Sequence, residues 1–518
     1  MAQLNSMDDL KKHKVGVLGV VGIIYTMCCG GAFGVEDMIS LAGPGMAILA
    51  LCVLPFIWAY PQAIACAELG SMIPAEGGTY VWMQKAFGEF WGFQMGFWMI
   101  IINYMFIPTL LILAGDYAGT ALGWSWGTTV AFKVALILIF GYINWRGIKD
   151  VSVVSTALAI IVFIAFTTIT IIGFANWQYN PVEPFYPEGE SGLMSAGYAF
   201  VIGMWVYGGY SQMGSAAGEF EDPQVIPKAL MIALPLTMFT YIGSTVAGMA
   251  SVGEWDSWGT DGISWMDVAS VGSPVLGGIF VLIAVIGQIS TFNSYMGTTA
   301  RTIFVMSMDK LAPKVFSRTS VKTGVPDTAL LTVVIACFIF CTFNFSMIVM
   351  LTVQAAFLMV IGVVISCMYL RNKEPYVNRP FTVNMPNWAF NAMCIMLLVV
   401  CVVFMFLNGT DYFFFGIVVI LFGPPLYWLL KRSYQERKGN KVMNPGDNKK
   451  IAFLFSIVAV FCAVGYLFFP WYDDPEWFEY IYEIPGILDM YIGGIGICAI
   501  VSAVLSGVFY MAHKRETA

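Results

Sequence analysis

The chain has 518 residues, of which 59% are hydrophobic and 11% are charged, and its formal net charge is -7. Soluble globular proteins carry about 25% charged residues, so this composition excludes a protein whose whole surface faces water. The acidic balance gives no support to a nucleic-acid partner.

The apolar residues form runs of about 20 residues, the length that crosses the hydrocarbon core of a bilayer. Backbone groups in that core have no water to bond, so each run is predicted to be a helix. We expect an all-α polytopic membrane protein with about 14 transmembrane helices, or about 13 if the short ninth run joins the tenth. The runs begin near Val15, Met46, Phe90, Gly127, Ser152, Leu193, Ala229, Pro274, Thr328, Ser346, Trp388, Tyr412, Ile451 and Tyr491.

Lysine and arginine predict the orientation of these helices. Suppose that the tail at residues 1–14 is cytoplasmic and that successive runs cross the membrane in alternating directions. All of the 25 Lys and Arg residues except Lys133 then fall on the cytoplasmic side. The opposite loops are acidic. This asymmetry predicts that both termini, including residues 513–518, are cytoplasmic, and the plasma membrane is the expected location. Lys133 is expected near the outer end of its helix, where its side chain can snorkel.

Cysteine and histidine offer little chemistry in this chain. The eleven cysteines lie in or beside apolar runs, which favours buried apolar side chains over disulfides or metal ligands. The two histidines, His13 and His513, lie in the tails. A histidine proton relay or a histidine-ligated metal inside the membrane is therefore excluded, and no cofactor is expected beyond a coupling ion.

Glycine pairs interrupt two of the apolar runs. The first run contains Gly30 and Gly31, and the sixth contains Gly208 and Gly209. Glycine weakens a helix interior by about 1 kcal/mol relative to alanine, although it also permits close helix packing. The two pairs lie five runs apart. Because successive runs cross the membrane in alternating directions, an odd offset places the second half in the opposite orientation to the first. Broken helices at matching places in two inverted halves point to a transporter substrate site.

The residues at these breaks resemble the amino acid–polyamine–organocation transporters. The residues that carry the likeness are Cys29, Gly30, Gly31, Ala32 and Phe33 at the first break, and the stretch 217–229 after the second. The resemblance covers residues 15–430. The stretches 30–37, 77–82, 86–98 and 217–219 are similar to those of polyamine-uptake-type members from plants and protists.

This resemblance implies a leucine-transporter-like fold of five plus five inverted helices, with discontinuous helices one and six. Residues 15–175 would form the first repeat, residues 191–370 the second, and residues 386–512 the accessory helices. It also implies secondary active transport by alternating access around the two breaks.

Two carboxylates follow the first break. Glu36 and Asp37 lie in an apolar run, where an acidic side chain is costly and predicts a function. Glu36 is expected to pair with a substrate ammonium; the alternative is that it only caps the half-helix. The run at the second break has Ser211 where many carriers of cations place an acid, so amino acids and polyamines both stay open as substrates.

Further candidates surround the breaks. Aromatic side chains at the second break can contact an ammonium through their ring faces, or simply pack, and Asn103 and Gln354 face the pocket or bond between helices. The resemblance gives Glu219 a gating or structural role. The predicted substrate-binding residues are Cys29, Gly30, Gly31, Ala32, Phe33, Glu36, Asn103, Trp205, Val206, Tyr207, Gly208, Gly209, Tyr210 and Gln354.

The coupling ion has two candidates. Ser290 and Thr291 are adjacent hydroxyls that suit sodium, since hard cations prefer oxygen ligands, or they bond back to their own helix. Proton-coupled relatives place a lysine in the fifth helix, but the matching position here is near Val162. Protons would then use Glu36, Asp37 or Glu68, and uncoupled exchange is the third alternative.

Two other classes compete with a carrier. An intramembrane enzyme would need a nucleophile or metal set at membrane depth, and the sequence contains no HExxH or GxSxG. A channel usually builds its pore from oligomeric symmetry or rings of charge. We therefore predict a carrier in the lipid bilayer for a small amine or amino acid. Flux direction and oligomeric state do not follow from the sequence.

Overall fold

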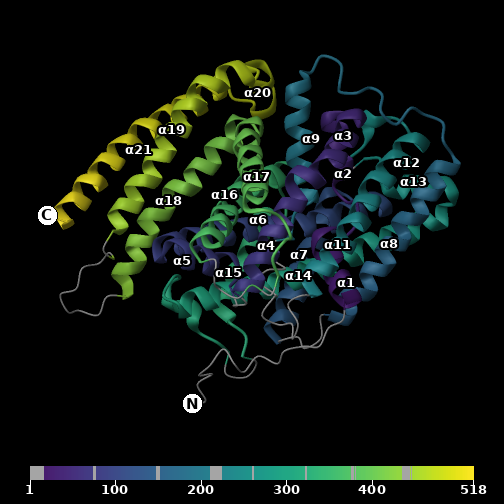
Figure 1. Ribbon diagram of the computed structural model, residues 1–518. Helices are drawn as coiled ribbons and strands as arrows, with labels where there is room; N and C mark the ends of the chain where they lie inside the picture. The colour runs from purple at the N-terminus through teal and green to yellow at the C-terminus, as the bar shows by residue number, and fades with distance from the viewer. Residues whose placement is uncertain are drawn as a thin grey trace.

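The computed structural model describes residues 17–73, 77–146, 152–210, 225–259, 262–320, 324–374, 379, 381–434, 444 and 446–517 (Figure 1). Within these ranges the chain is helical, and its only extended pairing is an isolated bridge between Trp258 and Ile263. The absence of strands in the described segments agrees with the prediction of an all-α protein.

The first part of the chain, up to residue 175, carries the first break between its first two helices. Its helices are α1 (Val17–Cys28), α2 (Val35–Ala42), α3 (Pro44–Leu54), the π-helix η2 (Pro55–Ala59), α4 (Tyr60–Met72), α5 (Thr79–Phe87), α6 (Glu89–Leu122), α7 (Trp126–Arg146) and α8 (Ser152–Ala175).

The middle part carries the second break directly after its first helix. Its helices are α9 (Gly192–Val206), α11 (Val225–Met238), the π-helix η4 (Phe239–Gly243), α12 (Ser244–Ser251), η5 (Trp255–Ser257), α13 (Trp265–Gly272), α14 (Pro274–Met308), η6 (Lys314–Ser317), α15 (Asp327–Phe340) and α16 (Phe345–Lys373).

The last part forms a group of helices on one side of the molecule, coloured green to yellow in Figure 1. The long helices α19 and α21 pack along each other, and the short α20 lies between them in sequence. These helices are α17 (Asn387–Leu407), α18 (Thr410–Tyr434), α19 (Asp447–Tyr472), α20 (Pro475–Tyr482) and α21 (Ile487–Thr517).

Ten stretches of the described chain are long and apolar enough to cross a membrane, and four shorter apolar helices accompany them. Each of the predicted runs corresponds to one of these helices. The ninth and tenth runs are separate, because α15 ends at Phe340 and α16 begins at Phe345. The protein is therefore an integral membrane protein with many apolar helices.

Both glycine pairs interrupt a helix, as their composition predicts. The chain leaves α1 after Cys28 and becomes helical again at Val35, and Gly30 and Gly31 adopt φ values of 59° and 109°. At the second break α9 ends at Val206, residues 207–209 are not helical, and Gly209 has a φ of 93°. Side chains other than glycine rarely adopt such backbone angles.

One prediction about charge is wrong. Lys133 does not snorkel to the membrane surface; it is 5% exposed, and its ammonium lies 2.7 Å from a carboxylate oxygen of Asp116 on α6. Gly115 provides the space, since a β-carbon there would lie 2.3 Å from Cε of Lys133. The lysine turns inward because the half-buried Asp116 neutralises its charge.

Candidate functional site

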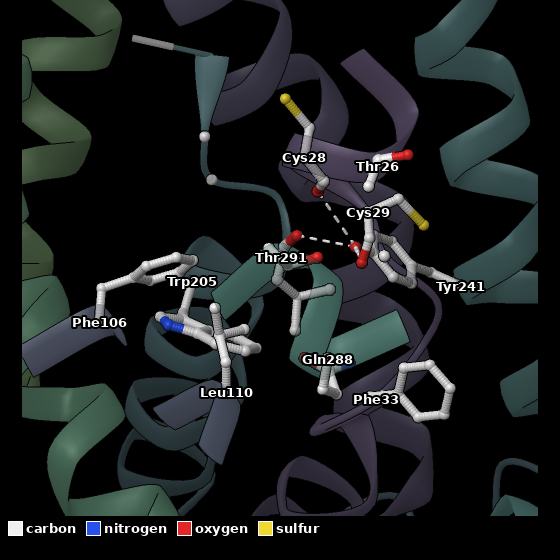
Figure 2. A pocket seen from close by; sticks show the side chains of 14 residues that line it. Thr26, Cys28, Cys29, Phe33, Phe106, Leu110, Trp205, Tyr241, Gln288 and Thr291 are labelled. Atoms are coloured by element: carbon white, nitrogen blue, oxygen red, sulfur yellow. Dashed lines mark hydrogen bonds between the residues drawn. The ribbon is translucent and has the colours of Figure 1, made fainter. Parts of the chain in front are cut away.

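A cavity lies where the two breaks meet (Figure 2). The space open to the centres of water molecules is about 40 Å³, which is room for about three waters. Its walls come from both breaks and from α6, η4 and α14. The lining residues are Thr26, Cys28, Cys29, Gly30, Phe33, Phe106, Leu110, Trp205, Val206, Gly208, Gly209, Tyr241, Gln288 and Thr291.

Tyr241 joins the two breaks. Its hydroxyl oxygen lies 3.2 Å from the carbonyl oxygens of both Cys28 and Cys29 in the first break, and 2.9 Å from that of Val206 at the second. A phenol has one hydrogen to donate, so the three carbonyls compete for it. Tyr241 sits in the π-helix η4, and such bulges are frequent at functional sites.

The cavity favours a positively charged group. Helices α1 and α9 both end there, and the carbonyl groups at a helix C-terminus carry negative partial charge. Ring faces are also available from Phe33, Phe106 and Trp205, and the rings of Phe106 and Trp205 lie 5.9 Å apart. None of the lining side chains in the described part of the chain is charged. An ammonium would therefore meet carbonyl oxygens and aromatic faces.

Helix α14 contributes two polar side chains to the wall. Gln288 is 5% exposed, and its amide forms no hydrogen bond to the described residues. The Thr291 hydroxyl donates to the carbonyl of Gly287 at 3.1 Å, and Ser290 does not line the cavity. The two adjacent hydroxyls proposed for sodium therefore do not converge in this conformation.

The structure brings together part of the predicted set. Cys29, Gly30, Phe33, Trp205, Val206, Gly208, Gly209 and Thr291 line the cavity, whereas Gly31, Ala32, Glu36, Asn103, Tyr207, Tyr210, Gln354 and Ser290 do not. Ser211 and Glu219 lie outside the described residues. Sequence reasoning missed Thr26, Cys28, Phe106, Leu110, Tyr241 and Gln288. Of these residues, only Phe106 could have been identified from the sequence, because it lies one helical turn after the candidate Asn103.

Glu36 lies behind the cavity instead of in its wall. It is fully buried, and its carboxylate accepts hydrogen bonds from the Gly34 backbone N–H at 2.8 Å and from the hydroxyl of Tyr117 on α6. The carboxylate turns back toward the free N–H groups at the start of α2, which is the geometry of the capping alternative. The next residue, Asp37, accepts a hydrogen bond from Ser346 on α16.

The remaining polar candidates lie away from the cavity, and two of them, Gln354 and Glu68, bond to other segments. Gln354 is fully buried on α16 and accepts a hydrogen bond from the Asn408 amide at 3.0 Å, which agrees with the interhelical alternative. Asn103 is buried on α6. Glu68 lies 2.6 Å from the guanidinium of Arg371, so an ion pair neutralises its charge.

Comparison with known proteins supports a transport function for this site. Residues 15–430 match the family model described as amino acid permease. The chain is 27% identical over 440 residues to a probable polyamine transporter of Arabidopsis thaliana, with 82% of this chain and 88% of that protein covered. It is 28% identical to polyamine transporter RMV1 of the same plant, covering 82% and 86%. It is also 28% identical to polyamine transporter PUT1 of Oryza sativa subsp. japonica, covering 61% and 59%.

Proposed function

Because the chain belongs to the amino acid permease family, it is a transporter and not an enzyme, and we propose that it moves small amine-bearing solutes, amino acids or polyamines, by alternating access. The observation that carries this proposal is the cavity that both breaks share. Main-chain segments near residues 29 and 207 line one space and are joined there by Tyr241.

The chemistry of the cavity suits an amine. Two helix C-termini direct carbonyl oxygens toward the space, and Phe33, Phe106 and Trp205 supply ring faces. The relatives named as polyamine transporters carry the same class of solute. The Gln288 amide, which bonds none of the described residues, can bond a second polar group of the solute, which an amino acid or a second amine of a polyamine would provide.

The size of the cavity requires a conformational change. Space for about three waters does not hold an amino acid or an extended polyamine, so the walls must separate for a solute to enter. The breaks provide the moving parts, because a non-helical segment lets its two half-helices rotate independently. If the half-helices α1 and α2 move one after the other, the cavity opens first to one side of the membrane and then to the other, which is alternating access.

The proposal extends to how the chain is arranged in the membrane. All fourteen apolar helices cross the plasma membrane, with both termini in the cytoplasm. Residues 15–175 and 191–370 form the two inverted repeats, and residues 386–512 form the accessory helices. The charge asymmetry of the loops and the odd offset between the breaks support this arrangement. Since Thr291 faces the cavity without Ser290, the arrangement favours a proton over sodium as the coupling ion.

Counterflow in proteoliposomes tests this function. Vesicles loaded with unlabelled putrescine, spermidine or single amino acids receive the same labelled compound outside. Saturable uptake that the internal solute accelerates is the expected result. Ion conductance without accelerated uptake would indicate a channel, and no uptake of any amine or amino acid would overturn the proposal.

A matched tryptophan pair tests the location of the site. Trp205 lines the cavity, whereas Trp388 is 76% exposed on the outside of α17. Removal of a desolvated ring face costs about 2 kcal/mol of cation binding, so Trp205→Ala should weaken the apparent affinity for the amine about thirtyfold. Trp388→Ala should leave it unchanged. Equal effects of the two substitutions would place the substrate elsewhere.

A further inference from the structure

Glu36 is a buried carboxyl group with no basic partner among the residues that the structure describes. It lies on α2, two residues after the first break, and is fully buried. The ion pairs observed in the described segments are Lys85–Glu374, Lys133–Asp116, Arg371–Glu68, Lys431–Glu89 and Lys450–Asp447. Glu36 takes part in none of them.

Other acids in the apolar helices have different surroundings. The buried Glu68 and the half-buried Asp116 each have a cation within 2.7 Å. Asp37 is 7% exposed and is bonded to Ser346. Of the three acids that the sequence offers for proton transfer, only Glu36 is both fully buried and bonded solely to neutral donors in the described chain. This difference separates Glu36 from Asp37 and Glu68.

A charge on Glu36 would be costly in this position. Burial of an ionised carboxylate costs several kcal/mol even after the surrounding protein relaxes. The Gly34 N–H and the Tyr117 hydroxyl lower that cost, but they bring no positive charge. Burying a charge is costly unless the charge is both paired and hydrogen-bonded. A proton on the carboxyl removes the charge altogether.

No Lys, Arg or His side chain bonds Glu36 among the residues that the structure describes. Its titratable neighbours are Tyr117 on α6 and Asp37 on α2, and Asp116 beside Tyr117 is already paired with Lys133. Helices α3, α9 and η5 also pack on α2. These three segments contain no Lys, Arg or His.

We propose that Glu36 is the proton-binding site that couples transport, holding a proton in the conformation observed here and releasing it when α2 moves. The inference rests on the proposed transport function. Because α2 begins directly after the break, separation of the cavity walls would expose Glu36 to water and let the proton leave. Solute movement and proton movement would then depend on the same half-helix.

Proteoliposomes that contain the pH dye pyranine test the coupling. Labelled spermidine should show counterflow in wild-type vesicles loaded with spermidine, and spermidine added outside empty wild-type vesicles should change the luminal pH. In Glu36→Gln the pH change should be lost while exchange of spermidine is still measurable, because exchange needs no net proton movement. Glu188→Gln, which removes an exposed acid of the loop before α9, is the matched control and should behave as wild type.

Each outcome separates the two proposals. Wild-type vesicles without spermidine counterflow would overturn amine transport and this inference with it. Counterflow without a luminal pH change would overturn the coupling alone. A pH change that persists in Glu36→Gln would move the proton site to another residue.

Two further measurements keep the inference testable if Glu36→Gln folds poorly. Infrared spectra of the wild-type protein at neutral pH should contain the stretch of a protonated carboxyl group, and Glu36→Gln should lose it; equal spectra would contradict the proposal. Tyr117→Phe keeps the carboxyl but removes a donor that stabilises its ionised form. The pH of half-maximal proton movement should therefore shift upward, and an unchanged midpoint would also contradict it.

Discussion

Tyr241 places one hydroxyl group among three carbonyl oxygens, two from the first break and one from the second. Main-chain groups in a break have no helical partner, and an unpaired buried polar group costs about 1–3 kcal/mol. The hydroxyl therefore stabilises the position of both breaks at once. A single side chain outside the breaks controls how they meet.

Tyr241→Phe should lower spermidine counterflow, since the carbonyls lose their donor at a cost of ~2 kcal/mol, or about thirtyfold in the transport rate. Tyr104→Phe is the control: that hydroxyl bonds Thr332 on α15 at 2.6 Å and lies outside the cavity lining. Counterflow and thermal midpoints of both variants check the prediction. Equal losses would show that Tyr241 matters only for general packing.

Asp473, at the end of α19, makes the stability of the folded protein depend on pH. Burial raises the pKa of Asp473 to about 6 from an ordinary value of 3.8, although the Thr410 hydroxyl and backbone N–H donate to it and oppose the shift. Because the folded protein binds this proton more tightly than the unfolded chain, the contribution to stability is present below pH 3.8 and is lost as the pH rises through about 6.

Asp473→Asn keeps an oxygen for both Thr410 donors and removes the buried charge. The thermal midpoint in detergent at pH 7 should rise, because a shift of this size corresponds to ~3 kcal/mol, and the decline between about pH 4 and 6 should flatten. Scans of both proteins across this range check the result. A parallel pH profile in the variant would mean that another group titrates there.

The element that moves in the proposed mechanism is the first broken helix, and its two adjacent glycines have different surroundings. A β-carbon on Gly31 would lie 2.4 Å from the Phe33 ring and 2.5 Å from the Phe166 ring. A β-carbon on Gly30 would find only the Thr26 carbonyl oxygen at 3.7 Å. Both residues have positive φ, but the φ of Gly31, 109°, lies farther from the left-handed helical region than the 59° of Gly30, so space and backbone strain both disfavour a side chain more strongly at Gly31.

Gly30→Ala should cost about 1–2 kcal/mol, the usual penalty of a left-handed residue. Gly31→Ala adds the displacement of two buried rings, for which overpacking typically costs a further 1–3 kcal/mol or so. Thermal midpoints in detergent should therefore rank wild type, Gly30→Ala and Gly31→Ala in descending order. The reverse order for the two variants would show that the break changes shape to accept a side chain.

At the scale of the whole molecule, composition predicts the helices well because bilayer thickness sets their length. Each apolar run corresponds to an apolar helical stretch of the described chain, and the glycine pairs marked both breaks. Apart from Thr291, the predicted residues that line the cavity all flank those pairs or belong to them. Tyr241 and Gln288 were missed because the direction in which each side chain points depends on how η4 and α14 pack. Glu36 does not line the cavity in this conformation because its carboxylate turns back to Gly34. Lys133 was misplaced because its partner, Asp116, comes from another helix.

The predicted orientation of the protein in the membrane rests on the charges of its loops and not on any single helix. The loop before α9 and the segment between α19 and α21 contain acids but no Lys or Arg, whereas the segment between α14 and α15 is basic, and basic loops stay in the cytoplasm.

Glu188 lies in one of the acidic loops and Arg318 in the basic one, and both side chains are exposed. A membrane-impermeant maleimide should label Glu188→Cys on intact cells, and Arg318→Cys only after permeabilisation. The unmodified chain measures the background from its own cysteines, eight of which are buried. Labelling of Arg318→Cys on intact cells would invert the predicted topology.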